Sequence, residues 1–201
     1  MILSSEDELL LDNMQRTIGR SVANEDFKSL RKLMFQEEFP RKSLFIEAGK
    51  LCSFTYFVVA GSCYLYYLNE NGDKNVIQFS LEGYWVSDLY SFFSGKNGIY
   101  YAETIEPVKV LGLTKVNHDL ACASNHTVEH FFRILIQNAF VAIQQRLTRL
   151  NSASAEFRYN NLVRQHPDFV QRIPQYLIAS YLGIKPQSLS RIRRKLANQR
   201  L

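Results

Sequence analysis

The spacing of apolar residues changes twice along the chain. Between residues 4 and 38, apolar side chains recur every three or four positions in a polar background, which predicts one or two short helices that end before Pro40. From Ser43 to Leu113, short runs of Phe, Tyr, Val and Ile are separated by glycines, a pattern typical of many short antiparallel strands in a barrel or sandwich. After Asn117 the period changes from two to nearly four, so the rest of the chain is predicted to be helical.

One hairpin stands out in the strand region. Its arms run from Cys63 to Leu68 and from Asn75 to Phe79, and the connection reads Asn-Glu-Asn-Gly-Asp. Asn and Gly tolerate the positive φ angles that tight turns require. The sequence therefore predicts two antiparallel strands here.

A long helix is predicted from His126 to Leu150. Its apolar stripe can pack on the strand domain, or it can form a parallel seam with the same helix of a second subunit, and we expect both on different faces. A dimer is favoured because two-fold protein symmetry suits two-fold DNA half-sites. The predicted seam residues are Phe132, Ile136, Ala139, Ile143 and Leu147. A further helix is expected to follow and to end near Val163, with Ser152 or Ser154 as its N-cap.

The segment from Ile173 to Leu196 has the pattern of a helix-turn-helix. Pro174 can occupy the first position of a helix, because its missing N–H would have no partner there. Gly183 suits the left-handed conformation that ends the first helix, and Pro186 begins the second. Apolar residues at spacings of three and four on both helices predict that they pack together.

The exposed face of the second helix carries the candidate DNA contacts. Side chains near the start of a recognition helix reach base edges in the major groove, which favours Gln187, Ser190 and Arg191 for direct readout. Lys185 and Ser188 are expected at phosphates. Positive charge without sequence preference comes from Arg193, Arg194 and Lys195.

The charge distribution supports this interpretation. The chain carries a formal net charge of +5. Residues 152–201 hold nine basic and two acidic residues, so the excess positive charge lies in this tail and the rest is slightly acidic. A basic module joined to an acidic one indicates double-stranded DNA as a partner. An arginine-bearing amphipathic helix that is merely solvated is the alternative.

Several other classes are disfavoured. The three cysteines are odd in number and widely spaced, which predicts reduced packing residues rather than a disulfide framework or a metal site. His126 and His130 are four apart but have no third ligand nearby, so neither a metal nor another cofactor is expected. Apolar runs are too short to span a membrane, and the acidic N-terminus is unlike a secretory leader, which favours a cytoplasmic protein.

These residues together resemble the Crp/Fnr family of bacterial transcription regulators. The segments Phe45–Gly49 and Tyr56–Gly61 are similar to that family's β-roll signature, although Lys50 and Thr55 depart from it. Ile178–Leu196 is similar to the family's DNA-reading element, with Gln187 and Arg191 on base-contacting positions. Pro186 stands where a polar or charged residue is common. The resemblance implies a cyclic-nucleotide-binding-like β-roll, a dimerisation helix and a helix-turn-helix.

The segment that would hold a cyclic nucleotide differs from the family pattern. Family members that bind cyclic nucleotides hold the phosphate with a Gly-Glu step and a following arginine, whereas this chain has Ser87-Asp88 and no arginine between Phe79 and Glu103. An anionic phosphate would lack its guanidinium partner there, so cyclic AMP is not expected to be the effector. Six residues could instead line an aromatic pocket for another small molecule, or belong to a plain β-roll core: Tyr84, Trp85, Asp88, Tyr90, Tyr100 and Tyr101.

The sequence therefore predicts an α+β protein with an N-terminal antiparallel β-roll, a long dimerisation helix and a winged-helix-like C-terminal module whose wing is short or absent. The predicted domains are a sensor at 1–125, a linker helix at 126–151 and a DNA-binding domain at 152–201. The expected function is sequence-specific transcription regulation by a homodimer, with RNA polymerase and an unknown small molecule as further candidate partners. A small-molecule sensor or protein-interaction module without specific DNA binding is the alternative. No catalytic motif appears in a suitable context, although Asp88 and His118 could be considered as an acid–base pair.

Overall fold

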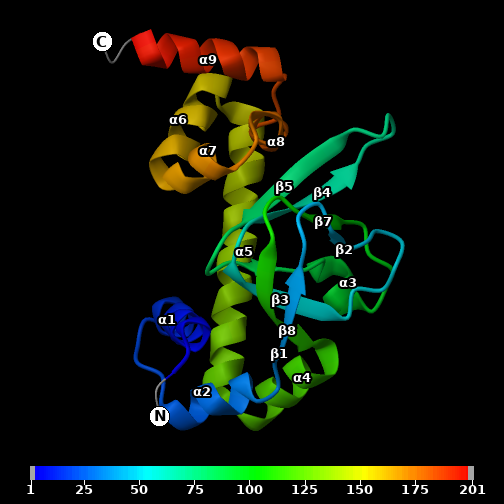
Figure 1. The fold of residues 1–201 in the computed structure, drawn as a ribbon, viewed down its shortest axis with the longest axis vertical. Coiled ribbons are helices and arrows are strands. Elements are labelled where there is room, and N and C mark those ends of the chain that lie inside the picture. Colours follow the sequence, from blue (N-terminus) through cyan, green and yellow to red (C-terminus); the bar gives the residue numbers. More distant parts are fainter. Residues whose placement is uncertain (1–2, 199–201) are drawn as a thin grey trace. The chain divides into compact units, whose positions relative to one another are not determined.

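The computed structural model describes residues 3–198 (Figure 1). The chain divides into two compact units. The first takes in the chain up to Leu65 and again Ser80–Phe140, whereas the second takes in Tyr66–Phe79 and the chain from Val141 onward. The units do not follow the linear order of the predicted domains, because the tip of the predicted hairpin belongs with the C-terminal helices.

Two four-stranded sheets form the β-roll. The first has the order β1-β8-β3-β6, with the strands β1 (Phe35–Phe39), β3 (Phe54–Ala60), β6 (Trp85–Val86) and β8 (Val108–Thr114). The second has the order β2-β7-β4-β5, with the strands β2 (Leu44–Ile46), β4 (Cys63–Leu68), β5 (Lys74–Ser80) and β7 (Tyr101–Thr104). All pairings of the first sheet are antiparallel, as is that of β2 with β7. The predicted antiparallel roll and the predicted hairpin, formed by β4 and β5, are both confirmed.

Helices pack on this roll within the first unit. They are α1 (Ser5–Ile18), α2 (Asn24–Arg31), α3 (Leu89–Ser94), α4 (Lys115–Ser124) and the first part of α5 (His126–Ser152) (Figure 1). The prediction of helix up to Pro40 was wrong for residues 35–38, which lie in strand β1. The two faces of β1 differ in exposure, as expected for a strand with one face toward the protein. The short helix α3 was not predicted.

A single apolar cluster joins the helices to the first sheet. It brings Leu10 and Met14 of α1 against Phe57 of β3, Leu111 of β8 and Phe131 of α5. All five side chains are fully buried. Burial of large apolar side chains is the main stabilising contribution here, at about 1.5–3 kcal/mol each.

Gly61 shows why the β-roll signature requires a glycine. Its φ is +84°, which L side chains rarely adopt, and a Cβ atom would lie 2.0 Å from the main-chain oxygen of Pro107. A side chain at this turn would therefore meet both a backbone clash and an unfavourable conformation.

The helical part of the second unit contains α5 from Val141, then α6 (Ala155–Gln165), α7 (Pro167–Arg172), α8 (Gln175–Tyr181) and α9 (Pro186–Asn198). The long helix and the helix after it were predicted to within two residues. Ser154 is the N-cap of α6 and accepts a hydrogen bond from the amide of Phe157, while Ser152 is the last residue of α5. Helix α7 was not predicted. Within the described residues, no helix is long and apolar enough to cross a membrane.

Candidate nucleic-acid interface

The two helices of the predicted helix-turn-helix are present and pack together. Pro174 precedes α8 as its N-cap, rather than occupying the first helical position, and its carbonyl oxygen accepts a hydrogen bond from the amide of Leu177 at 3.0 Å. Leu177 and Ile178 are buried on one side of α8, and Leu189 is buried on α9. The apolar spacing thus buries the faces that were predicted to meet.

Gly183 makes the turn between the helices. Its φ of +65° places it in the left-handed region, and the amide of Ile184 reaches back to the carbonyl of Ala179 at 3.0 Å. A Cβ atom at this position would lie 3.3 Å from the Cδ2 atom of Leu150. Both the backbone conformation and the close approach of α5 favour glycine.

Helix α9 presents its predicted contact residues to solvent. Ser188 is half-buried, while the other candidate contacts are exposed: Lys185, Gln187, Ser190, Arg191, Arg193, Arg194 and Lys195. Lys195 donates to both carboxylate oxygens of Glu156 at 2.9 and 3.1 Å, so part of its charge is offset within the protein. In the part of the chain that the structure describes, Arg191, Arg193 and Arg194 form no ion pair. The positive charge of this helix face is therefore available to an external anion.

The hairpin residues of the second unit hold helix α8. The Ser180 hydroxyl donates to the carbonyl of Lys74 at 2.7 Å and accepts from the amide of Val76 at 3.0 Å. Phe79 packs against Phe169 and Tyr181, with ring centroids 5.5 and 5.1 Å apart. Sequence reasoning missed this contact, because nothing in the local pattern indicates that a hairpin and a helix about a hundred residues later meet.

Replacing Ser180 by alanine should destabilise the second unit. Two hydrogen bonds would be lost and the amide of Val76 would lose its partner, which is expected to cost about 1–2 kcal/mol. Urea unfolding of the full chain measures this difference, with the exposed Ser190→Ala as the matched control, for which a change below about 0.5 kcal/mol is expected. Equal stability of the two variants would mean that the hairpin contact contributes nothing measurable.

Helix α5 exposes apolar side chains that the protein itself does not cover. Within the second unit, Val141, Ile143 and Leu147 are 52%, 60% and 54% exposed. Phe140, the last residue of the first unit, is 61% exposed. Sequence reasoning named Ile143 and Leu147 for the seam but missed Phe140 and Val141.

One predicted seam residue lies elsewhere. Phe132 is 5% exposed and packs on Trp85 and His118, with ring centroids 5.4 and 4.7 Å apart. It belongs to the core of the first unit, because the apolar stripe turns toward the β-roll at this end of the helix. Ile136 and Ala139 are half-buried.

The predicted effector pocket does not form around its central residues. Asp88 is fully buried and accepts hydrogen bonds from the amides of Ser91, Ile99 and Tyr100 at 3.1, 2.7 and 2.9 Å. Its carboxylate thus caps α3 and holds the following loop. The Trp85 ring packs in the core with Phe57, and its indole nitrogen donates to Asn13. Both residues serve the β-roll core, the alternative that the sequence left open. Tyr90 is exposed, whereas Tyr84, Tyr100 and Tyr101 are partly buried.

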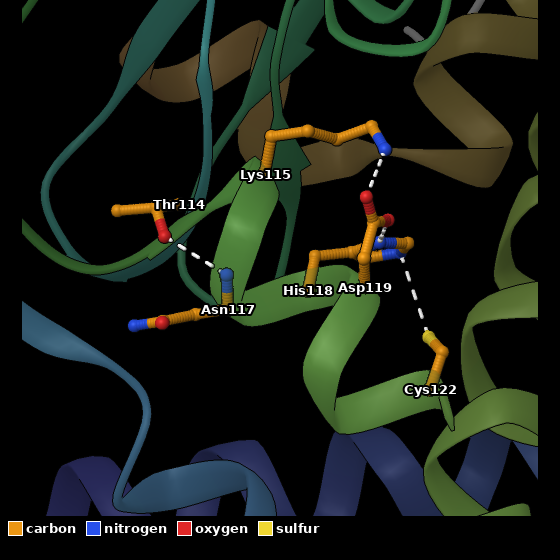
Figure 2. Close-up of polar contacts among 6 residues, drawn as sticks. All are labelled: Thr114, Lys115, Asn117, His118, Asp119 and Cys122. Carbon is orange, nitrogen blue, oxygen red and sulfur yellow. Dashed lines mark hydrogen bonds and ion pairs between the residues drawn. The ribbon is translucent and has the colours of Figure 1, made fainter. Parts of the chain in front are cut away.

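Helix α4 carries the other group that could suggest chemistry (Figure 2). His118 does not pair with Asp88; its Nδ1 atom lies 3.0 Å from Oδ1 of Asp119, and its Nε2 atom lies 3.8 Å from Sγ of Cys122. Hydrogen bonds from Lys115 and His118 lower the pKa of Asp119. Burial raises the pKa of the Cys122 thiol to about 11, so this arrangement does not produce a reactive thiolate.

The buried thiols should react slowly in the folded protein. Burial raises the pKa of Cys63 to about 12, above the value of 9.0 for a free thiol. At pH 8 we expect iodoacetamide to modify Cys63 and Cys122 at least about ten-fold more slowly in the native than in the denatured chain, because the thiolate is the nucleophile. Raising the pH above about 9 should lower the free energy of unfolding, since only the unfolded chain then ionises these thiols. Equal labelling rates in both states would contradict this interpretation.

Comparison with known proteins supports the fold at low sequence identity. No protein-family model matches the chain, and no curated protein matches it. FixK2 from Bradyrhizobium japonicum is similar in structure with a TM-score of 0.71 and 17% identity, covering 83% of this chain and 85% of that chain. CLP, the c-di-GMP-responsive global regulator of Xanthomonas campestris, has a TM-score of 0.71 and 12% identity, covering 89% of this chain and 94% of that chain.

A third similar structure is the catabolite activator protein of Thermus thermophilus. Its TM-score is 0.59 at 16% identity, and the match covers 91% of this chain and 87% of that chain. The predicted wing would follow Asn198 and lies outside the described residues. The β-roll, the long helix and the helix-turn-helix occur in the expected order, and the chain has the Crp/Fnr-like fold.

Proposed function

We propose that this protein is a sequence-specific, DNA-binding transcription regulator. The observation that carries the proposal is the exposed face of α9, which begins at Pro186 and bears arginines without acidic partners among the described residues. A helix of this kind fits the major groove, whose base edges it can read by hydrogen bonds. The excess of basic residues in the tail supports the same conclusion.

The residues of this interface would divide into two groups. Gln187, Ser190 and Arg191 lie near the start of α9 and would contact base edges. The flanking residues would contact phosphates: Lys185, Ser188, Arg193, Arg194 and Lys195. Lys195 contributes less than a free lysine if its pairing with Glu156 persists on DNA.

The protein would act as a homodimer on a palindromic site. Exposed apolar side chains on α5, above all Ile143 and Leu147, support a seam with the same helix of a second copy. Two recognition helices related by a two-fold axis would then meet half-sites about one helical turn apart.

The β-roll is proposed as a sensor that does not bind cyclic AMP. Asp88 stands where a phosphate would require positive charge, and its carboxylate is already bonded to three amides. A second anion beside this buried carboxylate would be repelled. A signal in the β-roll would act by shifting the population of DNA-competent dimers, and RNA polymerase is a proposed partner at the promoter.

Selection of duplexes from a random pool by the purified full chain, at fixed salt, tests this function. We expect a palindromic consensus whose half-sites are about ten base pairs apart. Recovery of no consensus, together with binding that depends only on salt, would contradict sequence-specific recognition. A pull-down of protein partners under those conditions would then favour the alternative of a protein-interaction module.

A further inference from the structure

The second unit contains a pocket that neither the proposed DNA contacts nor the β-roll accounts for. It has a volume of about 180 Å³ and lies between the last turns of α5, helix α6 and the end of α8. All of its lining residues belong to the second unit. They include Gln145 and Arg149 of α5, Gln165 of α6, and His166.

Three arginines and no carboxylate line this pocket. The arginines are Arg146, Arg149 and Arg158. Glu156, the acidic residue at the start of α6, is paired with Lys195 instead and does not line the pocket. Three guanidinium groups around one small space repel one another, and an anion between them would offset that cost.

Two of these guanidinium groups are held in place by main-chain carbonyls. Arg158 donates through Nε to Leu182 at 3.0 Å and through Nη1 to Ala153. Arg146 donates through Nη2 to Val76 at 2.8 Å and to Tyr181 at 3.0 Å. Their positions are therefore fixed by the fold before any ligand arrives, which lowers the entropic cost of binding.

Arg149 is the member with donors to spare. Its Nη2 atom donates to the side-chain oxygen of Gln145 at 2.8 Å. Among the described residues it has no acidic partner, and its Nε and Nη1 atoms make no other hydrogen bond. The Nη2 atom of Arg158 likewise makes no hydrogen bond within the described residues. These donors can turn toward an anion in the pocket.

We propose that this pocket binds the phosphate group of a small phosphorylated molecule. Planar guanidinium forks match phosphate oxygens by paired hydrogen bonds, and the amides of Gln145 and Gln165 add neutral donors. The pocket is smaller than the roughly 300–1,000 Å³ typical of sites for whole drug-sized ligands, so it accepts a compact group rather than an entire nucleotide.

Such a ligand would touch the residues that position the helix-turn-helix. Arg146 and Tyr181 line the pocket, and the same two residues contact the hairpin through Val76 and Phe79. Arg146 also lies over the Tyr181 ring, 4.6 Å from its centroid. Occupancy of the pocket would therefore bear on the contacts that hold α8.

Calorimetric titration of the full chain with inorganic pyrophosphate, without DNA and at constant ionic strength, tests the proposal. We expect saturable binding with one site per chain. Arg149→Gln should raise Kd at least about ten-fold, since it removes one charged hydrogen-bonding partner and leaves the fold with a single lost bond to Gln145. Arg149→Lys should lie between this variant and the wild type.

The matched control is Arg133→Gln, which makes the same change of charge on the same helix. Arg133 is exposed, pairs with Glu129 and does not line the pocket, so Kd should stay within two-fold of the wild type by our account. Absence of saturable binding, or equal weakening in both variants, would overturn the proposal. A loss of duplex affinity specific to Arg149→Gln without pyrophosphate binding would assign the pocket to DNA phosphates instead. Because the titration contains no DNA, it can fail while the proposed DNA binding stands.

Discussion

Replacing Arg191 by alanine is expected to weaken binding to the selected duplex by about 1–3 kcal/mol, which is roughly five- to 150-fold. Arg191 is exposed in the first half of α9 and forms no ion pair within the described residues. Its side chain can therefore give both of its parallel donors to guanine O6 and N7. Specificity at one base position in each half-site should relax at the same time. Fluorescence anisotropy on the consensus duplex and on single-base variants measures both effects.

Arg194→Ala supplies the contrast for that experiment. Its charge is equally exposed on the same helix, but it is expected to meet phosphate, so the loss should be similar on specific and random DNA. The slope of log K against log salt should become shallower by about one. If both variants lost affinity equally on all sequences, the division into base-reading and phosphate-binding residues would be wrong.

The double variant Ile143→Asp/Leu147→Asp should be a monomer that binds the palindrome at least about 100-fold more weakly. Both side chains are large, apolar and more than half exposed on α5, and they are four residues apart on one helix face. Aspartates at a seam would bury unpaired charge, and a monomer would lose the gain from binding two linked half-sites. Sedimentation equilibrium measures the mass, and anisotropy measures the affinity.

The matched control is Gln144→Asp/Thr148→Asp, which adds the same charge at the same spacing. Both positions are exposed and polar, so this variant should remain a dimer and retain most of its affinity. An Ile143→Asp/Leu147→Asp protein with the mass of the wild type would refute the seam.

Local pattern was sufficient to predict the elements that have strong local causes. Asn69 and Gly72 specify the hairpin turn, where Gly72 has a φ of +81° and the Asn69 side chain accepts hydrogen bonds from the amides of Asn71 and Asp73. The long apolar stripe specified α5, and Gly183 located the turn of the helix-turn-helix. In each case the physical requirement lies within a few residues of sequence.

Features that depend on distant contacts could not be predicted in this way. Phe132 shares the spacing of the seam residues, and only the fold places it against Trp85 rather than at the surface. Asp88 resembles a ligand-binding carboxylate until three amides are found around it. The arginine pocket was missed because its members, from α5 and α6, are brought together by folding.

The most direct test of the central claim changes the distance between half-sites. We expect the wild-type protein to bind most tightly when the half-site centres are about 10–10.5 base pairs apart, close to one helical turn of DNA. Inserting five base pairs turns one half-site to the opposite side of the duplex, so the affinity should fall to about that of a single half-site. An affinity that is indifferent to this insertion would contradict a two-fold dimer that reads DNA with the two α9 helices.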